Sequence, residues 1–189
     1  METVELTSAL AGSQQSLAEL NQESGVRASK CYQCGKCTAG CPVAFAMDKT
    51  PREIMRLVQL GLMDEALQSH TIWLCAGCVT CSTRCPREVD IARVMETLRI
   101  MARRKGIVAE KKIDLFHSIF LKSVERFGRV YELGLVLQNN LQGLQPFKDV
   151  DLGPAMLLKG KIALLPHSIK DNGEVKKIFA NVRKRGGKV

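Results

Sequence analysis

The amino-acid sequence predicts a mainly α-helical protein, with a compact core and helical extensions on its N- and C-terminal sides. Two observations support this fold class. Apolar residues recur at intervals of three and four along most of the chain, which is the period of a helix. Two cysteine-rich runs, residues 31–42 and 75–86, are joined by a segment that shows the same period instead of strand alternation. With 189 residues, the chain is long enough for one domain with tails.

The two cysteine runs have identical spacing. The first reads C-Y-Q-C-G-K-C-T-A-G-C-P and the second reads C-A-G-C-V-T-C-S-T-R-C-P. Both have the form C-x2-C-x2-C-x3-C-P, which is typical of bacterial ferredoxins that bind [4Fe–4S] clusters. Three closely spaced thiolates can surround one face of a cubane, and in two-cluster ferredoxins the fourth cysteine of each run ligates the other cluster. The spacing therefore predicts two [4Fe–4S] clusters with crossed ligation.

The predicted ligands are all eight cysteines of the chain. Cluster I is expected on Cys31, Cys34, Cys37 and Cys85, and cluster II is expected on Cys75, Cys78, Cys81 and Cys41. Crossed ligation holds the two clusters close enough to exchange electrons. Small residues in the runs also let backbone amides approach the cluster sulfurs, and such hydrogen bonds help to set the reduction potential.

Other uses of the cysteines fit the sequence less well. A disulfide framework agrees with an even number of cysteines, but the chain is much longer than the secreted mini-proteins that depend on one. Structural zinc needs four ligands, usually as two separated C-x2-C pairs, whereas each run here offers three near ligands and a fourth before proline. A three-iron cluster would result if one cysteine failed to ligate, and nothing in the residues points to that cysteine.

The N-terminal residues 1–24 are expected to form a helical extension. Leu6, Leu10, Leu17 and Leu20 lie at helix-compatible spacing in an otherwise polar stretch. Gly12 and Ser13 are expected to interrupt it, which would leave one or two short helices that pack on the core or on a partner.

The segment between the two runs is predicted to be helical. Thr50-Pro51-Arg52-Glu53 is a capping box with proline at the first helical position, and apolar residues follow at helical period up to a break at Gly61. A second short helix is expected over residues 63–67. Because small bacterial ferredoxins use strands and tight turns here, the helical segment predicts a two-cluster α-helical ferredoxin domain over residues 25–106.

The helix after the second run is predicted from its cap and its apolar stripe. Asp90 can cap it, Gly106 can end it, and the stripe consists of Ile91, Val94, Met95, Leu98 and Met101. Arg99, Arg103, Arg104 and Lys105 lie toward its C-terminal end, where cations suit the helix dipole. These cations form either a solvated helix end or a basic docking edge for an acidic partner.

Residues 107–140 are expected to be a helical extension, and residues 141–189 an irregular C-terminal arm. An apolar stripe runs from Ile113 to Phe127 and stops at Gly128, and another helix is predicted over residues 129–138. One small core can hardly bury both faces, so part of this extension is expected to pack on a partner. The arm is broken repeatedly by glycine and proline, a last basic helix is expected over residues 175–185, and the tail 183–188 is expected to be mobile.

Charge and composition limit the class of protein. The chain has 28 Lys and Arg against 19 Asp and Glu, a formal net charge of +9. Each oxidised cubane with four thiolates carries about −2, so the loaded chain is expected at about +5, and nucleic-acid binding becomes a weak alternative. Residues 1–5 do not resemble a signal peptide, and no run is long enough for a transmembrane helix. Reduced thiols therefore predict a cytoplasmic location.

The sequence offers no evident means of transforming a substrate. If all eight cysteines are ligands, none is left as a nucleophile or a redox disulfide. There is no G-x-G-x-x-G for a nucleotide cofactor and no C-x-x-C-H for haem, and His70, His117 and His167 are scattered along the chain. No paired carboxylates are placed for acid–base catalysis. The chain is therefore expected to relay electrons inside a larger enzyme, without catalytic residues or a small-molecule substrate of its own.

The wording of the two runs resembles one family in particular. C-Y-Q-C-G-K-C-T-A-G-C-P, the helical linker and C-A-G-C-V-T-C-S-T-R-C-P resemble the C subunit of heterodisulfide reductase over residues 25–105. The resemblance implies a two-[4Fe–4S] protein that passes electrons from a flavin-containing A subunit to a catalytic B subunit, which reduces the disulfide CoM-S-S-CoB. In that family, the B subunit binds its clusters through motifs with adjacent cysteines. This chain has no Cys-Cys pair, which agrees with the relay role.

Two other functions stay open at this point. The first is the iron–sulfur subunit of another cytoplasmic dehydrogenase or reductase complex, such as a succinate- or glycolate-oxidising one. A succinate-type subunit normally adds a [2Fe–2S] domain with further cysteines upstream, whereas the 30 residues before Cys31 contain none. The second is a non-enzymatic sensor with structural clusters.

Overall fold

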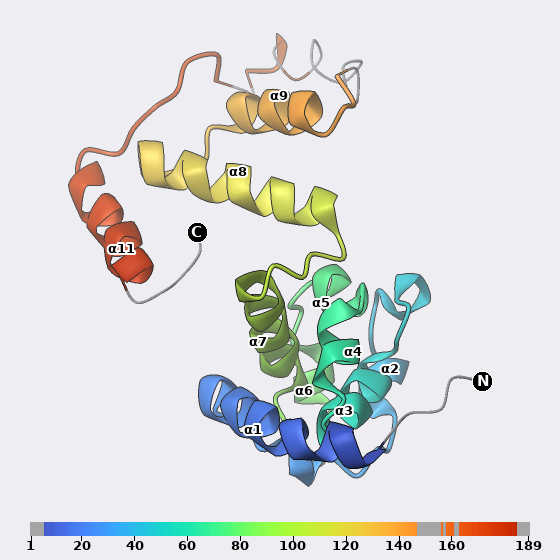
Figure 1. Cartoon of the computed structure of the whole chain (residues 1–189). Coiled ribbons are helices and arrows are strands. Elements are labelled where there is room, and N and C mark those ends of the chain that lie inside the picture. The colour runs from blue at the N-terminus through green and yellow to red at the C-terminus, as the bar shows by residue number, and fades with distance from the viewer. Residues whose placement is uncertain (1–5, 147–155, 157, 161–162, 185–189) are drawn as a thin grey trace. The chain divides into compact units, whose positions relative to one another are not determined.

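The computed structural model describes residues 6–146, 156, 158–160 and 163–184, with the backbone alone for residues 6–13. It divides into two compact units, residues 1–109 and residues 110–189. All regular structure in the described ranges is helical (Figure 1). The predicted mainly α class with helical extensions is thus confirmed. No helix in these ranges is both long and apolar enough to cross a lipid bilayer.

The first unit contains both cysteine runs and a set of short helices around one longer helix. Its elements are α1 (Leu6–Ser24), η1 (Ala28–Lys30), α2 (Lys36–Ala39), η2 (Ala44–Ala46), α3 (Pro51–Leu60), α4 (Met63–Gln68), α5 (Thr71–Leu74), α6 (Thr80–Thr83) and α7 (Ile91–Arg104).

Helix α7 is the centre of this unit, because α1, α4, α5 and α6 all pack against it. The apolar stripe predicted for it is buried throughout: Ile91, Val94, Met95, Leu98 and Met101 are each at most 2% exposed. Ile54, Met55 and Val58 of α3 are fully buried in the same core. Each such side chain stabilises the fold by roughly 1.5–3 kcal/mol relative to exposure. This packing gives the cysteine runs a rigid support.

The predicted helix starts are confirmed by their caps. Thr50 Oγ1 accepts from Glu53 N (3.4 Å) and Glu53 Oε2 accepts from Thr50 N (2.6 Å), which is the reciprocal capping box. Asp90 Oδ1 accepts from Arg93 N (3.1 Å) and also from Ser82 Oγ (2.6 Å). The second contact ties the start of α7 to α6, inside the second cysteine run.

One prediction for the N-terminal side was wrong. Helix α1 runs without a break from Leu6 to Ser24, through Gly12 and Ser13. Glycine in a helix interior costs only about 1 kcal/mol relative to alanine. Helix α1 packs against both α3 and α7, and its Leu20 is completely buried. That burial outweighs the low helix propensity of the two residues.

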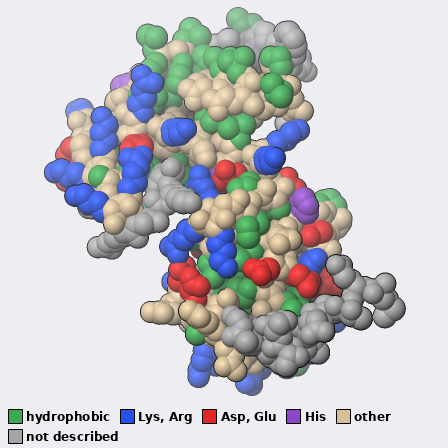
Figure 2. Space-filling view, in the orientation of Figure 1, with side chains coloured by type: hydrophobic (Ala, Val, Ile, Leu, Met, Phe, Trp, Pro, Cys, Tyr) green, Lys and Arg blue, Asp and Glu red, His purple; other side chains and the backbone are tan. Residues whose placement is uncertain are grey.

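The second unit has three described helices: α8 (Lys111–Phe127), α9 (Glu132–Gln142) and α11 (Asn172–Lys184). Helix α8 ends at Gly128 as predicted, and it packs against both α9 and α11. Arg183 of α11 forms a two-bond ion pair with Glu125 of α8, at 2.6 and 2.8 Å. Figure 2 shows hydrophobic side chains gathered over α8 and α9, where Phe116, Val136 and Leu137 are exposed.

Two helices of the second unit begin at other residues than predicted. Helix α9 lies at 132–142 instead of 129–138, because Tyr131 N donates to Ser123 Oγ (2.9 Å) and the residues before it form the connection from α8. Helix α11 begins at residue 172 instead of 175. Parts of the predicted arm, residues 147–155, 157 and 161–162, and the tail beyond residue 184 lie outside the described residues.

Candidate functional site

The two cysteine runs follow the same backbone path. Each run has a positive φ at its third residue (Gln33 +65°, Gly77 +63°) and again at its fifth (Gly35 +81°, Val79 +63°). Each then forms one four-residue helix, α2 or α6, and the fourth cysteine lies two residues beyond the end of that helix. Helices α2 and α6 pack against each other. The two runs are therefore paired copies of one structural turn.

The fourth cysteine of the first run lies with the first three cysteines of the second. Cys41, Cys75, Cys78 and Cys81 line one cavity. The other residues around it are mainly apolar: Val43, Met47, Pro51, Ala76, Val79, Ala92 and Met95. These four cysteines are the set predicted to ligate cluster II. The cavity is thus a largely apolar pocket, partly open at the exposed Cys78 and Val79, and it offers four soft sulfur donors, which is the donor chemistry of an iron–sulfur cluster.

The cysteines predicted for cluster I show two separate electrostatic links, one of Tyr32 with Cys34 and Cys85 and one of Cys37 with Cys31. The pKa of the Tyr32 hydroxyl is raised, first by its hydrogen bond to Cys34 and also by the nearby charges of Cys34 and Cys85. Burial raises the pKa of the Cys37 thiol, and the charge of Cys31 adds to that effect. Cys34 and Cys85 thus share one neighbour although 51 residues separate them (85 minus 34).

The two groups of cysteines also adjoin one another. Burial raises the pKa of the Cys81 thiol, and the charges of Cys75 and Cys37 raise it further. Cys37 and Cys81 are the third cysteines of their runs, and they lie on the packed helices α2 and α6. Across the described residues, no three Cys, His, Asp or Glu side chains converge as ligands of a single metal ion. A cubane differs from such an ion because each thiolate binds a separate iron.

Several sulfur atoms have hydrogen-bond partners. Gln33 Nε2 donates to Cys31 Sγ (3.6 Å), and Val89 N donates to Cys85 Sγ (3.4 Å). The Cys78 thiol lies 3.4 Å from Thr80 Oγ1, and the pKa of Cys78 is lowered because Thr80 can donate to the thiolate through its hydroxyl and its backbone N–H. Such partners favour a charged sulfur, as cluster ligation requires.

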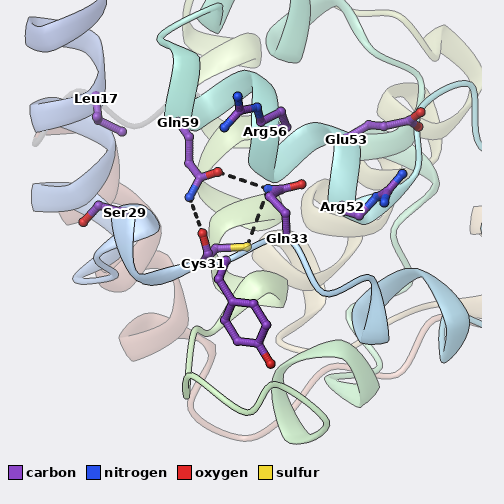
Figure 3. Close-up of a pocket in the computed structure, with 9 residues that line it drawn as sticks. Leu17, Ser29, Cys31, Gln33, Arg52, Glu53, Arg56 and Gln59 are labelled. Atoms are coloured by element: carbon purple, nitrogen blue, oxygen red, sulfur yellow. Dashed lines mark hydrogen bonds between the residues drawn. The ribbon is translucent and has the colours of Figure 1, made fainter.

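Residues from distant helices support each run, and sequence reasoning missed them. Gln59 of α3 donates to Cys31 O (2.6 Å) at the start of the first run (Figure 3). Arg99 of α7 donates to Ile72 O and Cys75 O (2.7 Å each) at the start of the second. Arg99 lies one turn after the buried Met95 and therefore on the same face of α7. That position in the sequence was the available signal that the Arg99 side chain packs on the protein. Its guanidinium therefore serves the fold instead of a docking edge.

Asp48 was also missed, and it organises the approach to the second run. Its carboxylate accepts from Ser69 Oγ (2.8 Å), Thr71 N (2.9 Å) and Thr71 Oγ1 (2.8 Å). Burial acts to raise the pKa of Asp48, but the bonds from Thr71 and Ser69 outweigh it and lower the pKa to about 2. Asp48 thereby fixes the start of α5, the helix that leads into Cys75.

Comparison with known proteins identifies the cysteine-rich part. Residues 27–89 match the 4Fe-4S dicluster domain family, and this range contains all eight cysteines. The iron-sulfur C subunit of a CoB–CoM heterodisulfide reductase from Methanopyrus kandleri is 42% identical over 89 residues, which cover 47% of this chain and 46% of that protein. The corresponding C 2 iron-sulfur subunit from Methanocaldococcus jannaschii is 44% identical over 98 residues, covering 52% and 50%.

A third relative is matched over most of its length. It is the C subunit of a ferredoxin:CoB-CoM heterodisulfide reductase from Methanosarcina mazei, with 31% identity over 126 residues that cover 63% of this chain and 77% of the relative. The chain belongs to the heterodisulfide reductase C-subunit family. The resemblance seen in the two cysteine runs is thus confirmed, although the chain spans only about half the length of the first two relatives, 46% and 50%.

Membership in the heterodisulfide reductase C-subunit family also identifies the cofactors. The dicluster match and the eight cysteines together indicate two [4Fe–4S] clusters. The residues fit this assignment, since the paired turns present two groups of thiols next to each other and one group lines an apolar cavity. The disulfide and zinc alternatives are thereby replaced by iron–sulfur chemistry.

Proposed function

We propose that this chain is the electron-transfer component of a heterodisulfide-reductase-type complex. It relays electrons from a flavin-containing A subunit to a catalytic B subunit, which reduces a disulfide such as CoM-S-S-CoB. The observation that carries this proposal is the pair of matching cysteine turns packed against each other in a chain of the heterodisulfide reductase C-subunit family. Two adjacent cluster sites in one rigid unit suit a relay that accepts an electron on one side and releases it on the other.

The proposed ligands follow the crossed pattern. Cys31, Cys34, Cys37 and Cys85 hold cluster I, and Cys75, Cys78, Cys81 and Cys41 hold cluster II. The cavity that Cys41 shares with three cysteines of the second run supports the second set. Each cluster, when bound, takes up and releases one electron. The protein's part is to hold the two sites next to each other, with Cys37 near Cys81 on the packed helices α2 and α6.

The substrate chemistry is assigned to the partner subunits. With all eight thiols committed as ligands, no cysteine of this chain remains to form a mixed disulfide with a substrate. Reduced thiols and oxygen-sensitive clusters support a cytoplasmic location for the complex. The apolar side chains exposed on α8 and α9, among them Phe116 and Leu137, offer surface for a neighbouring subunit.

Anaerobic reconstitution of the full chain tests the cofactor part of the proposal. About eight irons and eight sulfides per chain are expected, with electron paramagnetic resonance signals of two reduced [4Fe–4S] clusters. Four irons or fewer in the wild-type chain would contradict it.

Anaerobic co-purification from the native source tests the partners. The chain is expected to bring down a flavoprotein and a protein with adjacent cysteines in one particle. A particle with a succinate- or glycolate-oxidising flavoprotein, and without a Cys-Cys protein, would favour an iron–sulfur component of another dehydrogenase complex instead.

A further inference from the structure

Two glutamines form a chain of hydrogen bonds that ends on a cysteine sulfur of the first run. Gln59 Nε2 donates to Ala28 O (3.2 Å) and to Cys31 O (2.6 Å). Gln33 Nε2 donates to Gln59 Oε1 (3.1 Å) and lies 3.6 Å from Cys31 Sγ, within range of an N–H···S bond. Figure 3 shows the two contacts of Gln33 and the bond from Gln59 to Cys31 O, in the pocket that is also lined by Arg52 and Arg56.

The chemistry of the neighbours determines which way both amides point. The carbonyl oxygens of Ala28 and Cys31 can only accept, so Gln59 must turn its nitrogen toward them. The side-chain oxygen of Gln59 then faces Gln33, so Gln33 must donate to it from its own amide nitrogen. The second N–H of that nitrogen is left for Cys31 Sγ. The donor at the sulfur is therefore fixed by two backbone carbonyls, through Gln59.

The first run places this donor at a conformational cost that the second run avoids. Gln33 has φ +65°, a left-handed conformation that costs residues other than glycine about 1–3 kcal/mol. The matching position in the second run is Gly77, with φ +63° and no side chain. Strain of this kind at a site suggests that the side chain serves a purpose. The second run has no amide donor at this position.

We propose that Gln33 raises the reduction potential of the cluster that Cys31 ligates, and that Gln59 is the positioning residue that aims it. The inference rests on the proposed ligation of a cluster by Cys31. Reduction adds one electron to the cluster and its thiolates, and an N–H directed at a ligand sulfur stabilises the more negative form. The cluster of the first run thereby becomes a more favourable place for the electron than it would be without Gln33.

The test is a redox titration of the anaerobically reconstituted full chain, followed by electron paramagnetic resonance. The variant Gln33→Met keeps the length of the side chain but removes the donor. It is expected to lower one of the two cluster potentials and to leave the other unchanged. At a fixed solution potential the ratio of reduced to oxidised cluster should fall several-fold, and a tenfold fall corresponds to about 59 mV for one electron.

Further variants separate this effect from general disturbance. Gln59→Met should lower the same potential by a smaller amount, because Gln33 loses its anchor but keeps its amide. Gln68→Met, the same replacement on the exposed end of α4, should change neither potential. Gln33→Gly removes the donor and also the strain, so it provides the test if Gln33→Met fails to hold its clusters.

The possible failures can be told apart. Iron-replete Gln33→Met or Gln33→Gly chains with both potentials unchanged would overturn this inference and leave the proposed function standing. An equal shift of both potentials would overturn it as well, because the effect would then not be local to one run. A wild-type chain without two clusters would overturn the proposed function, and the inference with it.

Discussion

The first and second cysteine runs share one backbone turn but receive different support from the helices around them. In the first run the side chain at the third position is Gln33 and the fifth position is Gly35, whereas in the second run these positions are Gly77 and Val79. Gln59 of α3 anchors the start of the first run, and Arg99 of α7 anchors the start of the second. The spacing of the cysteines thus determines the turn, while the surrounding residues make the two sites unequal.

The residue before the fourth cysteine shows the same difference. It is Gly40 in the first run and Arg84 in the second. A Cβ atom at Gly40 would lie 2.6 Å from the Arg84 guanidinium, so the small residue of one run leaves room for the large residue of the other. The two runs therefore fit together because they carry residues of different size at this matching position.

The largest effect is expected from breaking the crossed ligation. Cys41→Ala lies in the first run, but it should remove the cluster of the second, so that it resembles Cys75→Ala and differs from Cys31→Ala. Each variant should lose about four of eight irons. Iron analysis and the remaining redox wave of each variant provide the measurement. If Cys41→Ala gave the same remaining wave as Cys31→Ala, each run would hold its own cluster, and crossed ligation would be contradicted.

A smaller loss is expected when the anchor of the second run is removed. Arg99→Met leaves the carbonyls of Ile72 and Cys75 without their charged donor, which should lower the free energy of unfolding by about 1.5–3 kcal/mol. Urea unfolding of the reconstituted chain measures this. Arg93→Met, on an exposed face of the same helix, is the matched control and should change stability by less than about 0.5 kcal/mol. Equal effects of the two variants would show that Arg99 is no special anchor.

The hydrogen bonds of Asp48 to Ser69 and Thr71, just before the second run, should make the free energy of unfolding depend on pH. Its folded-state pKa of about 2 lies below the usual value of about 3.9 for an unfolded chain. Its contribution is therefore complete above about pH 4–5 and is lost as the pH falls through both values. Since Asp48 is exposed, solvent reduces this contribution to about 1 kcal/mol.

The variant Asp48→Asn tests this dependence. It should be less stable than the wild type by a constant amount from about pH 8 to about pH 5, with the difference narrowing in more acidic solution. Urea unfolding at several pH values gives the two curves. A difference that grew on acidification would have the wrong sign and would contradict the assigned role.

The smallest effects are expected at the fifth position, where the runs carry Gly35 and Val79. Val79→Gly relieves a left-handed conformation that is unfavourable for a β-branched residue, and should raise the free energy of unfolding by about 1 kcal/mol. Gly35→Ala should lower it by about 1 kcal/mol, although the new Cβ would meet Arg52 Cδ at an ordinary 3.8 Å. Chemical unfolding of the pair should give opposite signs. The same sign for both would mean that packing, not backbone conformation, decides this position.

The local signals in the sequence predicted the longer helices of the first unit. The capping box at Thr50 and the apolar stripe of α7 are patterns within a few residues, and both appear in the structure as predicted. The contacts of Gln33 with Gln59 and of Arg99 with Cys75 join residues 26 and 24 positions apart. No periodic pattern in the sequence predicts such contacts. The unbroken α1 and the shifted start of α9 were missed for a related reason, since packing and one side-chain bond outweighed local propensity. The ligand sets themselves stay predictions.

The hydrogen bond between Ser82 and Asp90 links the second cysteine run to the start of α7. Asp90 caps the helix around which the first unit is built, and Ser82 belongs to the turn that carries Cys81. Ser82 Oγ also accepts from Ala92 N (3.1 Å), so the turn and the first helical residues share one small network. Loss of the clusters is therefore expected to loosen the packing around α7 as well, so limited proteolysis should cleave the cluster-free chain faster than the reconstituted chain.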